Sequence, residues 1–220
     1  PVLDLRLFKL LPYSVGMLTL VTLYMGDNTV KAIAPFLLIN GLQLSASKAG
    51  LFIGLYHGMR LPISPVIGIL SDKLGTSILM ITGLALLSLG LFIIGLTVTS
   101  SNETALWIGF LLAGIGTATF DPANGSSIMG SVPKELLGNG SAAVATGRQI
   151  GLTIGGTLGT AIFASTAGNH AGLSPTTPLA ALPNTAVLVG GSNAMIMSAT
   201  IAFLGTLIIF VLFKKPIKTK

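Results

Sequence analysis

Long apolar stretches constrain this chain more than any other feature. Six of them, separated by polar joints, occupy most of the 220 residues. A helix needs about 20 mostly apolar residues to cross a bilayer, and each stretch is that long. Only 8% of the residues are charged, whereas soluble domains carry about 25%, so a soluble globular fold is excluded. We predict spans at Pro12–Leu38, Lys48–Leu70, Thr76–Val98, Thr104–Gly130, Ser141–Ser165 and Asn193–Phe213.

The distribution of lysine and arginine predicts how these spans are oriented. Cytoplasmic loops of membrane proteins carry an excess of both residues. With both termini in the cytoplasm, the outside retains only Lys48, and the long joint Thr166–Ser192 is external. We therefore expect a multi-pass protein of the plasma membrane in this orientation. The inner side then carries Arg6, Lys9, Lys73, Lys134, Lys214, Lys215, Lys218 and Lys220.

The spans fall into two groups of three. The third and the sixth contain no ionisable residue, whereas the others contain or border on several. Inverted three-helix repeats within a six-helix unit are a known transporter design, although chance could also produce this pattern. We predict an all-α integral membrane fold of six transmembrane helices in two inverted repeats. Residues 1–11 form an amphipathic cytoplasmic linker, residues 12–213 the bundle, and residues 214–220 a basic cytoplasmic tail.

Four ionisable residues lie in the middle of the first two spans. Asp27 and Lys31 are four residues apart, and His57 and Arg60 are three apart, so each pair shares one helical face. A charge at this depth costs roughly 2.5–3.5 kcal/mol and normally faces a protein interior or a water-filled cavity. Antiparallel packing of the two spans brings all four to a similar depth, which indicates a path for a solute or protons.

Two interpretations of this cluster remain open. A low dielectric favours the protonated carboxyl of Asp27, whereas a nearby cation favours the carboxylate, so its protonation can respond to what occupies the cavity. That is the physical basis of proton-coupled transport. Alternatively, Asp27 and Lys31 neutralise each other and His57 is a hydrogen-bonded core residue. Pro62 and Pro65 interrupt the second span, as a simple kink or as a hinge.

The joint between the second and third spans reads Gly68-Ile-Leu-Ser-Asp72-Lys73-Leu-Gly75. Asp72 precedes the next helix and is expected to cap its free N–H groups. The glycines permit a tight turn and close backbone approach. This pattern resembles the cytoplasmic loop signature of the major facilitator superfamily, in which it contributes to gating. The family usually continues with basic residues where this chain has Thr76 and Ser77.

The fifth span contains four glycines at every fourth position and one charge. Spaced small residues make a flat stripe against which another helix packs, so we assign the glycines to helix packing. Arg148, about two turns into the membrane, is a candidate pathway residue. The run Arg148-Gln149-Ile-Gly-Leu-Thr-Ile-Gly resembles the penultimate helix of the fourteen-helix drug:proton antiporters of that superfamily, and Asp4-Leu-Arg-Leu-Phe8 resembles the linker before their last six helices. The glycines are Gly147, Gly151, Gly155 and Gly159.

Asp121, followed by Pro122, is the remaining charge within a span, near the inner end of the fourth. Repeat symmetry pairs this span with the one that bears Asp27, which makes Asp121 a second pathway candidate. The alternative is that Asp121 only caps a broken inner turn.

The resemblance implies proton-coupled efflux of hydrophobic or cationic drugs by one half of a transport unit. The chain begins at Pro1 without a methionine, and we expect an N-terminal half, or a second chain, to complete it. The alternatives are an exporter of another solute, such as a lipid-linked glycan or sodium, or a non-transporting scaffold. An enzyme is disfavoured because metal motifs, nucleotide loops and membrane-protease motifs are lacking. We expect no cofactor, and no nucleic-acid partner despite the net charge of +6.

Overall fold

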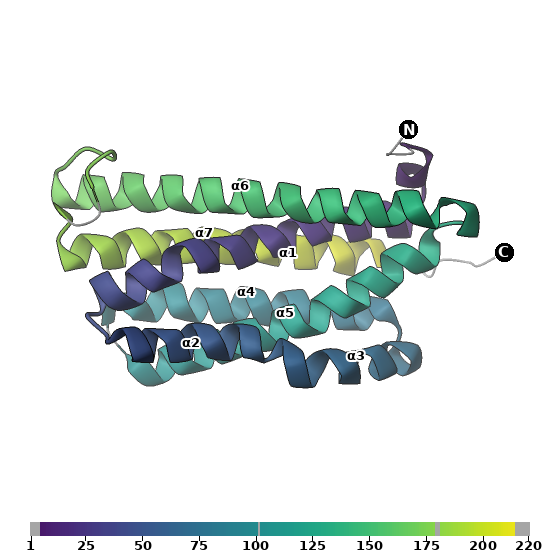
Figure 1. The fold of residues 1–220 in the computed structure, drawn as a ribbon, viewed down its shortest axis with the longest axis horizontal. Helices are drawn as coiled ribbons and strands as arrows, with labels where there is room; N and C mark the ends of the chain where they lie inside the picture. The colour runs from purple at the N-terminus through teal and green to yellow at the C-terminus, as the bar shows by residue number, and fades with distance from the viewer. Residues whose placement is uncertain (1–4, 101, 179–180, 214–220) are drawn as a thin grey trace.

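A computed structural model describes residues 5–100, 102–178 and 181–213, apart from the side chains of Leu5, Asp72 and Phe213. The described residues form helices joined by short connections (Figure 1). The predicted tail at 214–220, and Asp4 of the predicted linker, lie outside them. The main helices are α1 (Leu11–Phe36), α2 (Ala46–Gly58), α3 (Arg60–Leu74), α4 (Thr76–Thr97), α5 (Glu103–Ser131), α6 (Leu137–Ala171) and α7 (Asn184–Phe213), and the short ones are η1 (Leu5–Lys9), η2 (Leu37–Gly41), η3 (Val98–Ser100) and η4 (Lys134–Leu136).

The first predicted span is α1 followed by the π-helical turn η2. Pro12 stands at the start of α1, where its missing N–H has no intrahelical partner to lose. Pro35 lies inside the last turn of α1 and does not end the helix. The chain then continues through η2 to Gly41, three residues beyond the predicted end.

The second predicted span is divided into α2 and α3 at Met59. Met59 is the C-cap residue of α2 and the N-cap residue of α3. Pro62, in the first turn of α3, cannot donate to the carbonyl of Gly58, and its ring crowds that carbonyl. The break therefore lies one turn before the proline. It places Arg60 at the first position of α3.

Helices α4 and α5 pack through facing glycines. A Cβ atom at Gly83 would lie 2.9 Å from the carbonyl oxygen of Gly116, and one at Gly90 would lie 2.6 Å from that of Gly109. Real side chains do not tolerate such distances, so glycine allows the two backbones to touch. Asn102 begins α5 by accepting a hydrogen bond of 3.1 Å from the backbone N–H of Ala105.

The last two helices are longer than predicted. Helix α6 continues six residues beyond Ser165 to Ala171, and α7 begins at Asn184 rather than Asn193. The predicted external joint Thr166–Ser192 is therefore reduced to residues 172–183. Gly172, with φ of +67°, ends α6 in the left-handed conformation that glycine adopts most easily.

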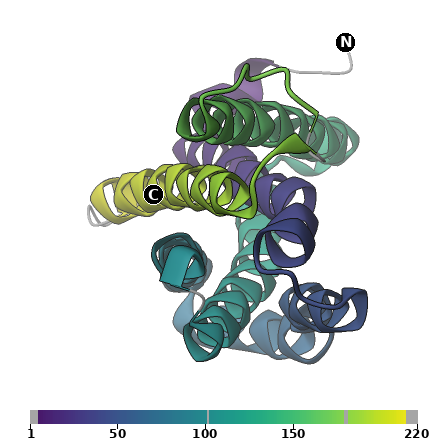
Figure 2. The ribbon, with the colours of Figure 1, turned by 90° about the vertical axis from the view of Figure 1, so that its left-hand side faces the viewer.

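Helix α1 runs through the middle of the bundle. It contacts α5, α6 and α7 along its length and α2 near its end. Viewed along the helices, α6 lies at one side of the bundle and α2 at the other, with α1 between them (Figure 2). The apolar helices α4 and α7 lie against each other. Both η1 and the end of α7 lie at the same end of the molecule (Figure 1).

Within the part of the chain that the structure describes, four helical segments are long and apolar enough to cross a membrane. The first two predicted spans are not among these segments. Helix α1 carries Asp27 and Lys31 in its middle, and α2 and α3 are each short. The four segments are Thr76–Ser100, Glu103–Ser131, Lys134–Ala171 and Asn184–Leu212.

Candidate functional site

Asp27 is the centre of a buried polar group contributed by three helices. Its side chain is 0% exposed, and its Oδ2 atom lies 2.6 Å from Nζ of Lys31, one turn further along α1. Its Oδ1 atom accepts a hydrogen bond of 3.0 Å from the hydroxyl of Tyr56 on α2. The same oxygen lies 3.5 Å from Nη2 of Arg60 on α3. We call Asp27, Lys31, Tyr56 and Arg60 the Asp27 group.

Asp121 is the centre of a second polar group, contributed by α1, α5 and α6. The hydroxyl of Tyr24 lies 3.1 Å and 3.0 Å from the two carboxylate oxygens of Asp121 and donates its proton to them. Nη2 of Arg148 lies 3.9 Å from Oδ1. The guanidinium carbon of Arg148 stands 4.9 Å from the centre of the Tyr24 ring, a cation–π contact. We call Asp121, Tyr24 and Arg148 the Asp121 group.

The two groups adjoin along α1. Tyr24 and Asp27 are three residues apart, so they lie about one turn from each other on the same face of the helix. Arg60, which pairs with Asp27, also lies within electrostatic range of Asp121. Two carboxylates and three cations therefore form one polar network between α1, α2, α3, α5 and α6.

Exposure differs systematically between acids and bases in this network. Asp27 is fully buried and Asp121 is 24% exposed, whereas the side chains of Lys31, Arg60 and Arg148 are 41%, 30% and 49% exposed. The carboxylates are thus enclosed and the cationic ends reach outward. Because cations outnumber carboxylates, the network needs a polar environment or further partners on its outer side.

The structure brings together most of the predicted pathway residues. Asp27, Lys31 and Arg60 meet as the antiparallel arrangement requires. His57 packs its ring edge-on against Tyr56, with 4.7 Å between the ring centres, and lies within electrostatic range of Asp27. Helix α5 is continuous through Asp121, which lies well before its end at Ser131. The alternative that Asp121 caps a broken inner turn is therefore wrong.

Two tyrosines of the network were not predicted. Tyr24 lies three residues before Asp27, and Tyr56 four residues before Arg60, so each shares a helical face with a charge within the span. That spacing was the available signal. Both hydroxyls donate to carboxylates of other helices, as buried tyrosine hydroxyls usually find a partner.

The glycine stripe of α6 lies against α1. A Cβ atom at Gly151 would lie 2.7 Å from the carbonyl oxygen of Val21, and Gly155 lies against the backbone of Met25. Thr29 donates a hydrogen bond of 3.0 Å across this contact to the carbonyl oxygen of Gly155. Arg148 belongs to the same helix, so this close contact positions it over Tyr24. Gly147 faces the side chain of Met17, and Gly159 faces the side chain of Thr29.

The predicted gating motif lies at the end of α3 rather than in a loop. Helix α3 includes Asp72 and Lys73 and ends at Leu74, so a single residue, Gly75, joins it to α4. Gly75 has φ of +82°, a conformation that favours glycine. Gly68 is exposed, as is Lys73. The side chain of Asp72, and hence its expected capping role, lies outside what the structure describes.

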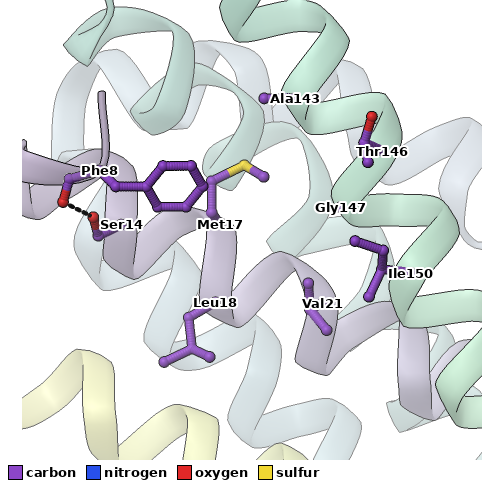
Figure 3. Close-up of a pocket in the computed structure, with 9 residues that line it drawn as sticks. All are labelled: Phe8, Ser14, Met17, Leu18, Val21, Ala143, Thr146, Gly147 and Ile150. Carbon is purple, nitrogen blue, oxygen red and sulfur yellow. Dashed lines mark hydrogen bonds between the residues drawn. The ribbon is translucent and has the colours of Figure 1, made fainter. Parts of the chain in front are cut away.

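An apolar pocket of about 390 Å³ lies between η1, α1 and α6 (Figure 3). Phe8 covers one end, and its carbonyl oxygen accepts a hydrogen bond of 2.5 Å from the hydroxyl of Ser14. The lining contains no charged residue, so the pocket is separate from the two polar groups. It is lined by Phe8, Ser14, Met17, Leu18, Val21, Ala143, Thr146, Gly147 and Ile150.

Apolar helices of membrane length around a charged network that includes a fully buried carboxylate are typical of a membrane transporter. The Major Facilitator Superfamily model matches residues 16–220, and the chain belongs to this family.

Known proteins from several bacteria match the chain. The riboflavin transporter RibZ of Clostridioides difficile (strain 630) is 30% identical over 74% of this chain and 35% of its own length. The uncharacterised MFS-type transporter YcnB of Bacillus subtilis (strain 168) is 32% identical over 98% of this chain and 44% of its own. The multidrug efflux pump LfrA of Mycolicibacterium smegmatis is 27% identical over 89% of this chain and 39% of its own. The chain thus spans less than half the length of these relatives.

Proposed function

We propose that the chain is one half of a proton-coupled exporter of hydrophobic, cationic compounds in the plasma membrane. In this proposal six spans cross the bilayer with both termini in the cytoplasm. The spans form two inverted triplets, the first consisting of α1, the broken pair α2–α3, and α4. The second consists of α5, α6 and α7. The multidrug efflux pump among the relatives supports the export of drugs.

A repeated pairing of aspartate and arginine supports the two triplets. In each triplet the first helix supplies the aspartate and the second the arginine. Asp27 and Arg60 lie 3.5 Å apart in the first triplet, and Asp121 and Arg148 lie 3.9 Å apart in the second. In each triplet the third helix, α4 or α7, is apolar, and the two lie against each other. This correspondence is expected of inverted repeats.

The burial of Asp27 beside Lys31 carries the proposal of proton coupling. A fully buried carboxylate 2.6 Å from an ammonium group is charged only while its partners remain in place. A proton that binds Asp27 removes the attraction that holds Lys31 and Arg60. Since the end of Lys31 is exposed, this cation can turn to water when released. Protonation would thereby change the charge that the network presents to a solute.

A second half is part of the proposal. Transport cavities in this architecture form between two halves that rock against each other around a central site. The outward-reaching ends of Lys31, Arg60 and Arg148 are unsuited to contact with lipid. We propose that an N-terminal half, or a second chain, covers them. The motif formed by Gly68, Asp72, Lys73 and Gly75 would then act in gating at the cytoplasmic side.

Proton-driven export in membrane vesicles tests the role of Asp27 in the complete transporter. Asp27→Asn keeps the size and hydrogen bonding of the side chain but cannot bind or release a proton. We expect proton-driven export to be lost while substrate binding remains measurable. The matched control is Asp27→Asn combined with Lys31→Met, which removes the stranded cation. Full recovery of export in the double variant would show a purely structural pair and refute coupling at Asp27.

A further inference from the structure

Arg148 occupies a position suited to an organic cation. It contacts the face of the Tyr24 ring at 4.9 Å and lies 3.9 Å from the carboxylate of Asp121. An aromatic face beside a carboxylate is how proteins recognise ammonium and other organic cations. Tyr24 is buried, and its hydroxyl donates to Asp121, so the ring and the carboxylate are fixed relative to each other.

Asp121 is held less firmly by cations than Asp27. The distance from Asp121 to Arg148 is 3.9 Å, against 2.6 Å from Asp27 to Lys31, and Arg148 is 49% exposed. Asp27 has Lys31 four residues further along its helix, whereas the corresponding position on α5 is Gly125. A Cβ atom at Gly125 would meet nothing within 4 Å. The space at Gly125, which corresponds to the position of Lys31 beside Asp27, is therefore open.

We propose that Tyr24 and Asp121 bind the cationic group of the transported compound, and that Arg148 occupies this site until the compound displaces it. This inference rests on the proposed function for the charge of the compound. The exchange replaces one cation by another, so the half-buried carboxylate is never left unpaired. The released Arg148 can move outward because its end is already half exposed. Each binding event thus turns a positive charge towards the covering half.

Equilibrium binding of tetraphenylphosphonium to the purified complete transporter, with no proton gradient, tests this proposal. Arg148→Gln removes the competitor, and we expect binding about tenfold tighter than in the wild type. Asp121→Asn removes the counter-charge, and we expect binding at least about tenfold weaker. Lys48→Gln is the matched control for lost positive charge, because Lys48 pairs with Glu103 at the end of the bundle and should leave binding unchanged.

A second pair of variants does not depend on removing any member of the site. Gly125→Lys supplies a tethered cation beside Asp121 and should abolish binding, whereas Ser126→Lys adds the same charge at the exposed neighbouring position and should not. Unchanged or weaker binding in Arg148→Gln, or full binding in Gly125→Lys, would overturn the inference. If these variants bind normally while the wild type exports the cation with protons, the inference fails and the proposed function stands. If Asp121→Asn loses binding but the wild type shows no proton coupling, the inference stands and the proposed proton coupling fails.

Discussion

Asp27 and Asp121 have the same kinds of neighbours, but the two carboxylates differ in how far they are buried. Each accepts from a tyrosine hydroxyl and faces an arginine of another helix. Asp27 is also paired with Lys31 and is completely buried, whereas Asp121 is partly exposed and lies 3.9 Å from Arg148. An enclosed carboxylate suits a proton, which is small, and an accessible one suits an organic cation. Enclosure therefore distinguishes the proposed roles of two similar sites.

The largest difference between the two groups should appear in stability. Asp27→Ala leaves Arg60 and Lys31 without a counter-charge and the buried hydroxyl of Tyr56 without an acceptor. We expect it to destabilise the protein by about 1–3 kcal/mol, the usual cost of leaving a buried hydrogen-bonding group without its partner, since the exposed ends of Lys31 and Arg60 can turn to water. Asp121→Ala breaks a more exposed and longer pair and should cost about 1 kcal/mol. Thermal unfolding of the complete transporter in detergent measures both.

Similar shifts of the unfolding midpoint in the two variants would remove the basis of this comparison. A large loss for Asp121→Ala would indicate that Arg148 and Tyr24 are held as firmly as the partners of Asp27. The proposed exchange of Arg148 would then require breaking a strong contact.

Pairs within one helix and the shared depth of the charges on the first two spans could be predicted from the sequence, but individual hydrogen bonds between helices could not. Asp27 and Lys31 meet because a helix fixes residues four apart on one face, whatever its neighbours do. The bonds from Tyr56 to Asp27 and from Tyr24 to Asp121 depend on the rotation and separation of two helices. Helix packing sets both quantities, and no short sequence pattern records them.

The boundaries of helices were predicted less well than their existence, for a similar reason. Apolar residues mark the part of a helix that crosses the membrane, but a helix continues into polar sequence while its backbone bonds remain satisfied. Helix α6 thus continues to Ala171, and α7 begins at Asn184. The break at Met59 was placed one turn late, because proline disturbs the carbonyl four residues before it rather than its own position.

A smaller effect is expected from the contact between α1 and α6, which positions only the Asp121 group. Gly155→Ala places a Cβ atom against the backbone of Met25, so α1 and α6 must move apart to accommodate it. We expect a loss of about 1–3 kcal/mol, typical of overpacking, together with weaker pairing of Arg148 with Tyr24. The described partners of Asp27 lie on α1, α2 and α3 rather than on α6, so the Asp27 group should be less affected.

Gly54→Ala on α2 is the matched control, because a Cβ atom there would meet nothing within 4 Å. It should be neutral or stabilising by about 0.5–1 kcal/mol, since alanine favours the helix. The unfolding midpoint and tetraphenylphosphonium binding are measured for both variants. Equal behaviour of the two would show that the glycine contact does not position Arg148.

The smallest effect is expected from a cysteine label that tests which way the chain is oriented in the membrane. Asp27 lies three residues beyond Tyr24 on α1, so the Asp27 group is about 4.5 Å further along the helix. In the proposed orientation α1 runs outward, so the proposed proton site lies nearer the outside than the proposed site of the organic cation. Thr176 is exposed in the connection between α6 and α7, and the chain has no native cysteine. Thr176→Cys should therefore leave transport unchanged and react with an impermeant thiol reagent added outside intact cells. Reaction only from the cytoplasmic face of inverted vesicles would reverse the orientation, and the order of the two sites along the transport path would be reversed with it.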